Sequence, residues 1–269
     1  TNAIIERKGA PTALITTAGF RDALEMAYEH RFEQYDVMID KPPPLVPRQW
    51  RLEVVERVDA RGGVLIPLDE SAATALVPQL KAASIKSLAI GLLHSYANPA
   101  HEKRLRDIFA AALPGVSITL SSDVCPEMRE YERFSTTCAN AYVQPVMAGY
   151  LGRLEQMIRA KGMACPVYLI TSGGGLTTID LARRYPIRLV ESGPAGGAIL
   201  AARVANECGL DKVLSFDMGG TTAKICLIDD FVPQQSRTFE VARQYRFQKG
   251  SGLPLRIPVI EMVEIGAGG

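Results

Sequence analysis

The sequence lacks the signatures of several common protein classes. It has no Cys-x-x-Cys pair, which excludes the usual structural zinc sites. Its five cysteines are widely spaced within mostly apolar segments, so we expect reduced, buried thiols in a cytoplasmic protein. It has no dense basic run, and its net charge is only +1, which argues against a nucleic-acid interface. It has neither an apolar run of membrane-spanning length nor a signal-peptide core, so we expect no membrane association.

Histidine is also scarce, with three residues in the chain. His94 and His101 are the close pair, and their spacing spans a predicted strand end and a predicted helix start. Such a pair could converge on a metal ion. The alternative, which we favour, makes His94 a hydrogen-bonded strand-end residue and His101 a solvated residue of the first helical turn.

Strand and helix patterns alternate in the first half of the chain. Strands are predicted to end at Leu14–Thr17 and to cover Ser87–Leu93 and Val116–Leu120, with a helix over Pro99–Leu113 between the last two. Such alternation predicts parallel strands with helices packed over the sheet. Thr16, Thr17 and Arg21 could line a polar site, but we favour the alternative, in which they only mark a strand end followed by a helix start.

Three further local elements are predicted in this half. A helix is expected over Arg21–Glu29, and a second over Glu70–Ala83 with Asp69 as its N-cap. Residues 51–59 alternate apolar and charged side chains, Arg61-Gly62-Gly63 predicts a turn, and residues 64–68 return, which together predict a β-hairpin.

A charge-dense segment leads into a long predicted helix, whose buried face would carry Phe134, Cys138, Tyr142 and Val143. Two interpretations of the segment stay open: a helix start stabilised by i,i+3 and i,i+4 ion pairs, or a polar wall of an active cleft. Its charged residues are Glu127, Arg129, Glu130, Glu132 and Arg133. Farther on, the glycine loop Thr171–Leu176, which includes Gly173 and Gly174, is predicted to be a ligand-facing turn from a strand into a helix.

Residues 191–229 carry the strongest indication of a function. They contain the small-residue turn Ser192–Gly197, an apolar helix over Ala195–Cys208, and two strand patterns flanking Asp217–Thr222. Glycines let the backbone approach a ligand and aim its N–H groups inward, and threonine hydroxyls add donors. An acid at the end of the first strand can hold Mg²⁺ or orient a water. A bare turn of this composition is more often an ordinary hairpin, but its neighbouring elements favour a phosphate site.

This order of elements resembles the actin, sugar-kinase and heat-shock-chaperone ATPase superfamily, in which a connect helix precedes the second phosphate hairpin. More narrowly, the chain resembles the ATP-using subunit of the hydantoinase/oxoprolinase family. The resemblance rests on eight segments in family order: TNAIIERKGAPTALITTAGFRD, PPPLVPR, ERVDARGGVLIPLDE, SYANPAHE, PEMREYERFSTTCANAY, ESGPAGG, FDMGGTT and EIGAGG. The family often carries an acid where this chain has Lys224, whose side chain we expect to point to solvent.

The resemblance implies an α/β fold in two parts. Residues 1–170 would form a mixed α/β region, and residues 171–269 the start of an actin-like, ribonuclease H-like ATPase lobe. In the family, the first phosphate hairpin lies upstream of the segment that resembles residues 1–22. We therefore expect this chain to be a middle fragment that is inactive alone.

The resemblance also implies the site, in which Asp217 and Thr221 would be catalytic. Asp217 would hold Mg²⁺, directly or through water. The nucleotide-binding residues would be Ser192, Gly193, Gly196, Gly197, Gly219, Gly220, Thr221 and Thr222. Lower in priority, the substrate cleft would include Glu127, Arg129, Glu130, Gly173 and Gly174.

The activity implied by the family is the ATP-driven opening of a cyclic amide, such as hydantoin, N-methylhydantoin or 5-oxoproline. ATP would be hydrolysed to ADP and phosphate in the presence of magnesium, and the chain would act with a second, B-type subunit. Two alternatives stay open. One is an ATP-dependent carboxylase subunit for ketones such as acetone, and the other is a non-catalytic, actin-like nucleotide switch.

Overall fold

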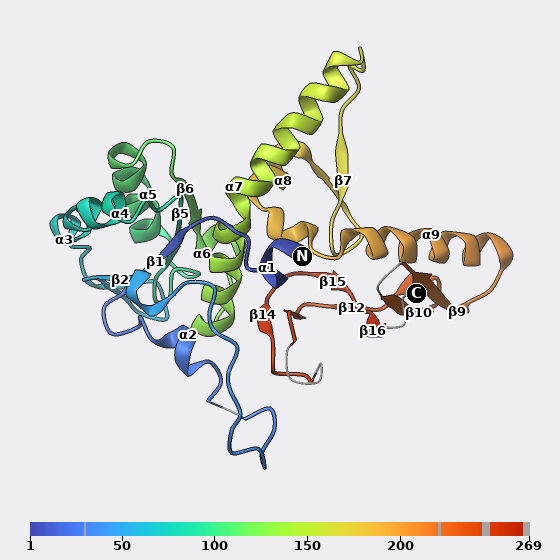
Figure 1. Ribbon diagram of the computed structural model, residues 1–269, viewed down its shortest axis with the longest axis horizontal. Helices are drawn as coiled ribbons and strands as arrows, with labels where there is room; N and C mark the ends of the chain where they lie inside the picture. The colour runs from blue at the N-terminus through green and yellow to red at the C-terminus, as the bar shows by residue number, and fades with distance from the viewer. Residues whose placement is uncertain (30, 220–221, 244–247, 266–269) are drawn as a thin grey trace. The chain divides into compact units, whose positions relative to one another are not determined.

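The computed structural model describes residues 1–29, 31–219, 222–243 and 248–265. The chain folds as two compact units (Figure 1). The first comprises Thr1–Tyr150 with Glu240–Arg256, and the second comprises Leu151–Phe239 with Ile257–Gly269. The α/β class predicted from the sequence is confirmed. The division into domains 1–170 and 171–269 stays a prediction.

A four-stranded sheet forms the centre of the first unit. Its strands are β1 (Thr12–Thr17), β2 (Arg51–Val54), β5 (Ser87–Gly91) and β6 (Ser117–Leu120). The order is β2-β1-β5-β6, and all neighbouring strands run parallel, as the alternation of strand and helix patterns predicts. Strands β1 and β5 are buried along their whole length, which is typical of a parallel sheet covered on both faces.

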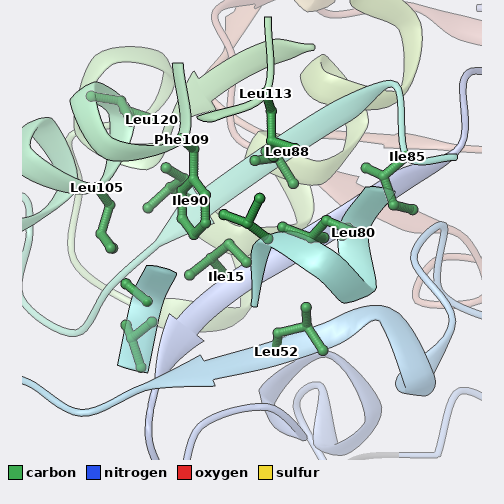
Figure 2. Close-up of a cluster of buried hydrophobic side chains, with 14 of the residues drawn as sticks. Ile15, Leu52, Leu80, Ile85, Leu88, Ile90, Leu105, Phe109, Leu113 and Leu120 are labelled. Atoms are coloured by element: carbon green, nitrogen blue, oxygen red, sulfur yellow. The ribbon is translucent and has the colours of Figure 1, made fainter. Parts of the chain in front are cut away.

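One face of this sheet packs against α3 (Glu70–Ala75), α4 (Val77–Ala82) and α5 (Ala100–Ala112), which Figure 1 shows gathered beside β5 and β6. Figure 2 shows how the strand and helix side chains of this core meet. The core includes Ile15, Leu52, Leu88 and Ile90 from the strands and Leu80, Leu105 and Phe109 from the helices. Burial of these apolar side chains is what holds the helices to the sheet.

The other face packs against α7 (Glu130–Ala160), a continuous helix that includes Pro145. Its predicted buried residues Phe134, Cys138, Tyr142 and Val143 are indeed buried. The contact with β5 is close at Gly91, where an added Cβ would lie 2.6 Å from Cδ1 of Phe134. Since the Phe134 ring is itself fully buried, only glycine fits at this position without a shift of the helix.

Three predictions in this unit need correction. The helix predicted over 70–83 divides at Leu76, because Pro78 lacks the N–H that a continuous helix would need and instead lies in the first turn of α4. Asp69 does cap α3, accepting the Ala72 N–H at 2.9 Å. The helix predicted over 21–29 is limited to α2 (Ala23–Met26), since Ala27 adopts φ 55°.

The predicted hairpin over 51–68 is also shorter than expected. Residues 51–54 join the parallel sheet as β2, and only β3 (Arg57–Val58) pairs with β4 (Val64–Ile66). The remaining short elements are α1 (Asn2–Ile5), η1 (Arg48–Trp50), α6 (Ser121–Val124), and the paired β13 (Phe239–Val241) and β14 (Leu253–Leu255).

The second unit is built on α9 (Ser192–Cys208) and the antiparallel strands β9 (Lys212–Met218) and β10 (Ala223–Asp229). Ala195, Ala198 and Ala202 of α9 pack against Cys226 and Ile228 of β10. Strands β11 (Val232–Pro233) and β16 (Val263–Ile265) extend this sheet, while β12 (Gln235–Ser236) pairs with β15 (Val259–Ile260).

Strand β9 is largely apolar, but one of its faces is not buried. Leu214, Phe216 and Met218 are each more than half exposed. In an antiparallel ladder, residues two apart share a face, so these side chains lie on the face opposite to the one that packs on α9. The sheet therefore buries one face and exposes apolar side chains on the other.

The glycine loop Thr171–Leu176 joins two strands rather than a strand and a helix. It connects β7 (Tyr168–Ile170) to β8 (Leu176–Thr178), which pair antiparallel, and the helix α8 (Ile179–Arg184) follows β8, then η2 (Pro186–Leu189). The prediction failed because residues 176–178, which directly precede the helix, extend to pair with β7. Within the described ranges, no helix combines the length and apolarity that a membrane span requires.

The cysteines divide into two classes of reactivity. All five cysteines are free, and three of them are buried. Cys165 and Cys208 are exposed, so the expectation that all the thiols are buried is wrong for these two. Burial raises the pKa of the Cys125 thiol to about 11 and that of Cys138 to about 12. Because the thiolate is the reactive form, these thiols stay protonated and unreactive at neutral pH.

We therefore expect a maleimide to modify Cys165 and Cys208 rapidly in the folded chain, and all five cysteines only after unfolding. Peptide mapping by mass spectrometry at short labelling times measures this directly. Labelling of Cys138 as fast as Cys165 in the folded chain would contradict the packing of α7 described above.

Candidate functional site

The hairpin β9–β10 forms as the sequence predicts. The two strands are in register from Lys212 opposite Asp229 to Met218 opposite Ala223. At the turn, the Gly219 N–H donates to the Thr222 carbonyl at 3.0 Å. Gly220 and Thr221, predicted to bind the phosphate, lie outside the described residues. Asp217, the predicted catalytic and metal-binding acid, lies near the end of β9 with an exposed side chain.

Ser192, Gly193, Gly196 and Gly197 form the first turns of α9 rather than a turn that precedes the helix. An added Cβ at Gly196 would lie 3.0 Å from Cδ1 of Ile170, so this glycine allows a close approach to β7. At Gly193 and Gly197 an added Cβ would have open space within the described part of the chain. The backbone N–H groups at the start of a helix favour an anion, and this start is lined by small residues.

Helix α9 and strand β9 border an open groove of about 550 Å³. Gly197, Leu200 and Val204 line it from the helix, and Ser215 and Asp217 line it from the strand. The groove brings together Gly197 and Asp217, two predicted site residues that are far apart in the sequence. A ligand at this end of the groove could meet both a carboxylate and the first turns of the helix.

Lys224 is a residue of this site that the sequence interpretation placed wrongly. Its side chain is only 16% exposed, not solvated, and it forms an ion pair with Glu191, the residue before α9. Glu264 Oε1 lies 3.8 Å from the Lys224 ammonium nitrogen. A signal was present, because Lys224, Cys226 and Ile228 are two residues apart and so share the face of β10 that packs on α9.

The two glycines predicted for the substrate cleft lie in the β7–β8 turn. Gly174 has φ 82°, and a Cβ there would lie 2.8 Å from Cδ1 of Ile199 in α9, so packing and backbone conformation both require glycine. Gly173 is less restricted, because a Cβ added there would lie 3.4 Å from the nearest atoms of Pro258. These contacts explain the glycines without a ligand, and their part in a cleft stays a prediction.

The predicted cleft residues Glu127, Arg129 and Glu130 belong to the first unit. Glu127 pairs with Arg256 at 2.9 Å, and Glu130 lies 3.6 Å from Arg133. Arg129 is exposed and has φ 81° just before α7. The Glu130–Arg133 pair, three residues apart, agrees with ion pairs at a helix start, one of the two interpretations left open. Glu127 instead pairs with a residue far along the chain.

His94 and His101 each contact a different partner. His101 is only 13% exposed, and its Nδ1 lies 2.8 Å from Oε2 of the buried Glu56, so the expectation of a solvated residue is wrong. His94 Nδ1 lies 3.3 Å from the Tyr96 hydroxyl, as expected of a hydrogen-bonded strand-end residue. In the described part of the chain, no three His, Cys, Asp or Glu residues are grouped to hold a metal.

Magnesium nevertheless suits the residues at the hairpin. Mg²⁺ keeps several waters and is usually held by one or two carboxylates together with substrate phosphates, so a preformed cage is not needed. Asp217 supplies one exposed carboxylate at the groove. Glu191 and Glu264 lie near Lys224, which partly neutralises them.

Two protein-family models match most of the chain. Residues 1–113 match the model of the hydantoinase/oxoprolinase N-terminal region, and residues 133–269 match the hydantoinase/oxoprolinase model. The chain belongs to the hydantoinase/oxoprolinase family. An uncharacterized protein of Methanocaldococcus jannaschii is 40% identical over 96% of this chain, and caprolactamase subunit alpha of Pseudomonas jessenii is 33% identical over all of it. The chain spans 38% of the length of each of these two relatives.

Solved structures of the family agree with the fold. The ATP-dependent caprolactamase of Pseudomonas jessenii superposes with a TM-score of 0.85 and 32% identity, over 100% of this chain and 38% of that one. Nucleotide-free acetone carboxylase superposes with a TM-score of 0.84 and 29% identity, over 99% of this chain and 38% of that one. Both likenesses are consistent with an actin-like ATPase lobe in this hydantoinase/oxoprolinase chain.

Proposed function

We propose that this chain is the phosphate-binding part of an enzyme subunit that opens a cyclic amide and hydrolyses ATP to ADP and phosphate. The observation that carries the proposal is the groove in which Asp217 of β9 and Gly197 of α9 meet. The family relationship supports the class of reaction, since caprolactam, the substrate named for one relative, is a cyclic amide. Hydantoin, N-methylhydantoin and 5-oxoproline are the candidate substrates.

The chemistry explains why such an enzyme would need ATP. An amide carbonyl is a poor electrophile, and transfer of a phosphoryl group to its oxygen creates a leaving group and an activated carbon for water to attack. The protein has to hold the phosphates in line with that oxygen and to stabilise developing charge. Backbone N–H groups at the start of α9 and in the Gly219 turn would hold phosphate oxygens, and Asp217 would hold Mg²⁺. When bound, magnesium would neutralise charge on the phosphates.

The proposed enzyme contains a second subunit. The relative from Pseudomonas jessenii is itself named as subunit alpha, which supports a hetero-oligomer. By the family resemblance, the partner would be a B-type subunit, and we place the complex in the cytoplasm.

The carboxylase alternative also has structural support. The superposition on acetone carboxylase is as good as that on caprolactamase, with TM-scores of 0.84 and 0.85. The fold therefore supports both reactions equally, and only substrate use can separate them.

The test is ADP release by the full-length protein expressed with its partner subunit. We would compare 5-oxoproline, N-methylhydantoin, hydantoin, caprolactam, and acetone with bicarbonate, each with and without Mg²⁺. The expected result is that one cyclic amide stimulates ADP release without bicarbonate. Stimulation only by the ketone with bicarbonate would overturn the amidase in favour of the carboxylase. Nucleotide binding without stimulation by any substrate would favour the nucleotide switch.

A further inference from the structure

We propose that Lys224 is a positioning residue of the phosphate site, which holds the start of α9 against the β9–β10 hairpin through its ion pair with Glu191. This inference rests on the proposed function, since the site that it concerns is the proposed nucleotide site. It assigns Lys224 a structural task in nucleotide binding rather than a contact with the phosphates.

Lys224 connects the elements that form the site. It lies on β10 directly opposite Asp217 of β9 and opposite Glu264 of β16. Its ammonium group pairs with Glu191, which immediately precedes Ser192 at the start of α9. One side chain therefore links the helix start to the hairpin that carries Asp217.

The ion pair is sheltered from solvent. The Lys224 and Glu191 side chains are 16% and 19% exposed, so water and salt screen their attraction less than that of a surface pair. The ammonium already faces Glu191 and lies 3.8 Å from a Glu264 oxygen. A cation engaged in this way serves to fix its carboxylate partners, not to contact a ligand.

The backbone of Glu191 shows why it needs to be held. Glu191 adopts the left-handed conformation, with φ 57° and ψ 24°, which is unfavourable for a residue other than glycine. Such a conformation persists where surrounding contacts maintain it, and it is often found at functional sites. The dihedral angles of Glu191 determine where the first turn of α9 points, so the Lys224 ion pair also orients the N–H groups of that turn.

The experiment measures the KM for ATP of the full-length protein with its partner subunit, using the amide substrate found above. Replacing Lys224→Met removes the ion pair, and we expect it to raise the KM for ATP roughly tenfold. This is the scale of effect seen when a residue that orients a metal-ligating side chain is lost. Lys224→Arg should stay within about twofold of the unchanged protein. Lys212→Met is the matched control, because Lys212 is an exposed lysine at the opposite end of the same hairpin.

A second background separates positioning from general loss of structure. Glycine adopts the left-handed conformation readily, so in a Glu191→Gly background the helix start no longer depends on the ion pair. We expect Lys224→Met to change the KM for ATP less than twofold in that background. Partial unfolding would instead lower the maximal rate and leave the KM of the remaining folded protein unchanged.

The outcomes distinguish the inference from the proposed function. If the unchanged protein binds ATP and Lys224→Met has the same KM as Lys212→Met, the positioning role is overturned while the proposed function stands. An equal tenfold rise in the KM for ATP on replacing Lys224→Met in both backgrounds would also overturn the positioning role, because Lys224 would then act independently of Glu191. If the unchanged protein does not bind Mg-ATP at all, both proposals fail.

Discussion

Replacing Glu102→Ala is expected to lower the free energy of unfolding by about 3–5 kcal/mol, the range for breaking a buried, charged hydrogen-bond network. Glu102 is fully buried at the start of α5. Its carboxylate accepts the Leu92 N–H at 3.0 Å, the Ser122 N–H at 2.9 Å and the hydroxyls of Ser121 and Ser122 at 2.6 and 2.7 Å. Alanine would leave these donors buried without an acceptor.

The same network includes the fully buried Arg133 of α7, whose Nε donates to the Ser121 hydroxyl at 3.2 Å and whose Nη2 donates to the Leu92 carbonyl at 2.8 Å. Loss of Glu102 would thus weaken the hydrogen-bond network that connects α5 and α7 to the ends of β5 and β6. Urea denaturation followed by circular dichroism measures the change. Glu70→Ala is the control, because Glu70 pairs with Arg104 at the surface and should contribute little. Equal midpoints for the two variants would contradict the network.

Replacing Asp217→Asn is expected to reduce substrate-stimulated ADP release by roughly 10²- to 10³-fold, the scale of losing one electrostatic group from an active site. Asparagine keeps the size of the side chain but removes the charge that would hold Mg²⁺. We therefore also expect the Mg²⁺ concentration for half-maximal activity to rise. The measurement is ADP release by the full-length complex across a magnesium titration.

Asp229→Asn is the matched control for this prediction. Asp229 is an exposed acid at the opposite end of the hairpin, where it lies opposite Lys212. The Asp229→Asn substitution should leave ADP release unchanged. Activity of Asp217→Asn close to that of Asp229→Asn would remove Asp217 from the proposed mechanism and leave the hairpin as a purely structural turn.

The sequence predicted the elements whose signals are local and strong. The parallel strands, the Asp69 cap, the helix over 195–208 and the hairpin around Asp217 all form near the predicted positions. Each depends on features that lie within a few residues, such as apolar periodicity, a capping side chain or a glycine turn.

The errors arose where distant parts of the chain decide. Lys224 was expected in solvent, but Glu191, which lies before α9, makes it an interior partner. His101 was expected at the surface, but the buried Glu56 binds its ring nitrogen. The alternation with Cys226 and Ile228 places Lys224 on the packed face of β10, but no local pattern identifies the partner in either pair, because each member alone resembles an ordinary charged residue. The glycine loop over 171–176 failed for a different reason, because its partner strand β7 directly precedes it and the two form a local hairpin that the following helix pattern obscured.

The close contact between Gly91 and Phe134 has an evolutionary consequence. Strand β5 can approach α7 only while position 91 has no side chain and position 134 fills the space with a buried ring. The two positions should therefore change together. Relatives with alanine or a larger residue at the first would be expected to carry a smaller side chain at the second. A single exchange at either position should be selected against, even though both positions lie far from Asp217 in the sequence.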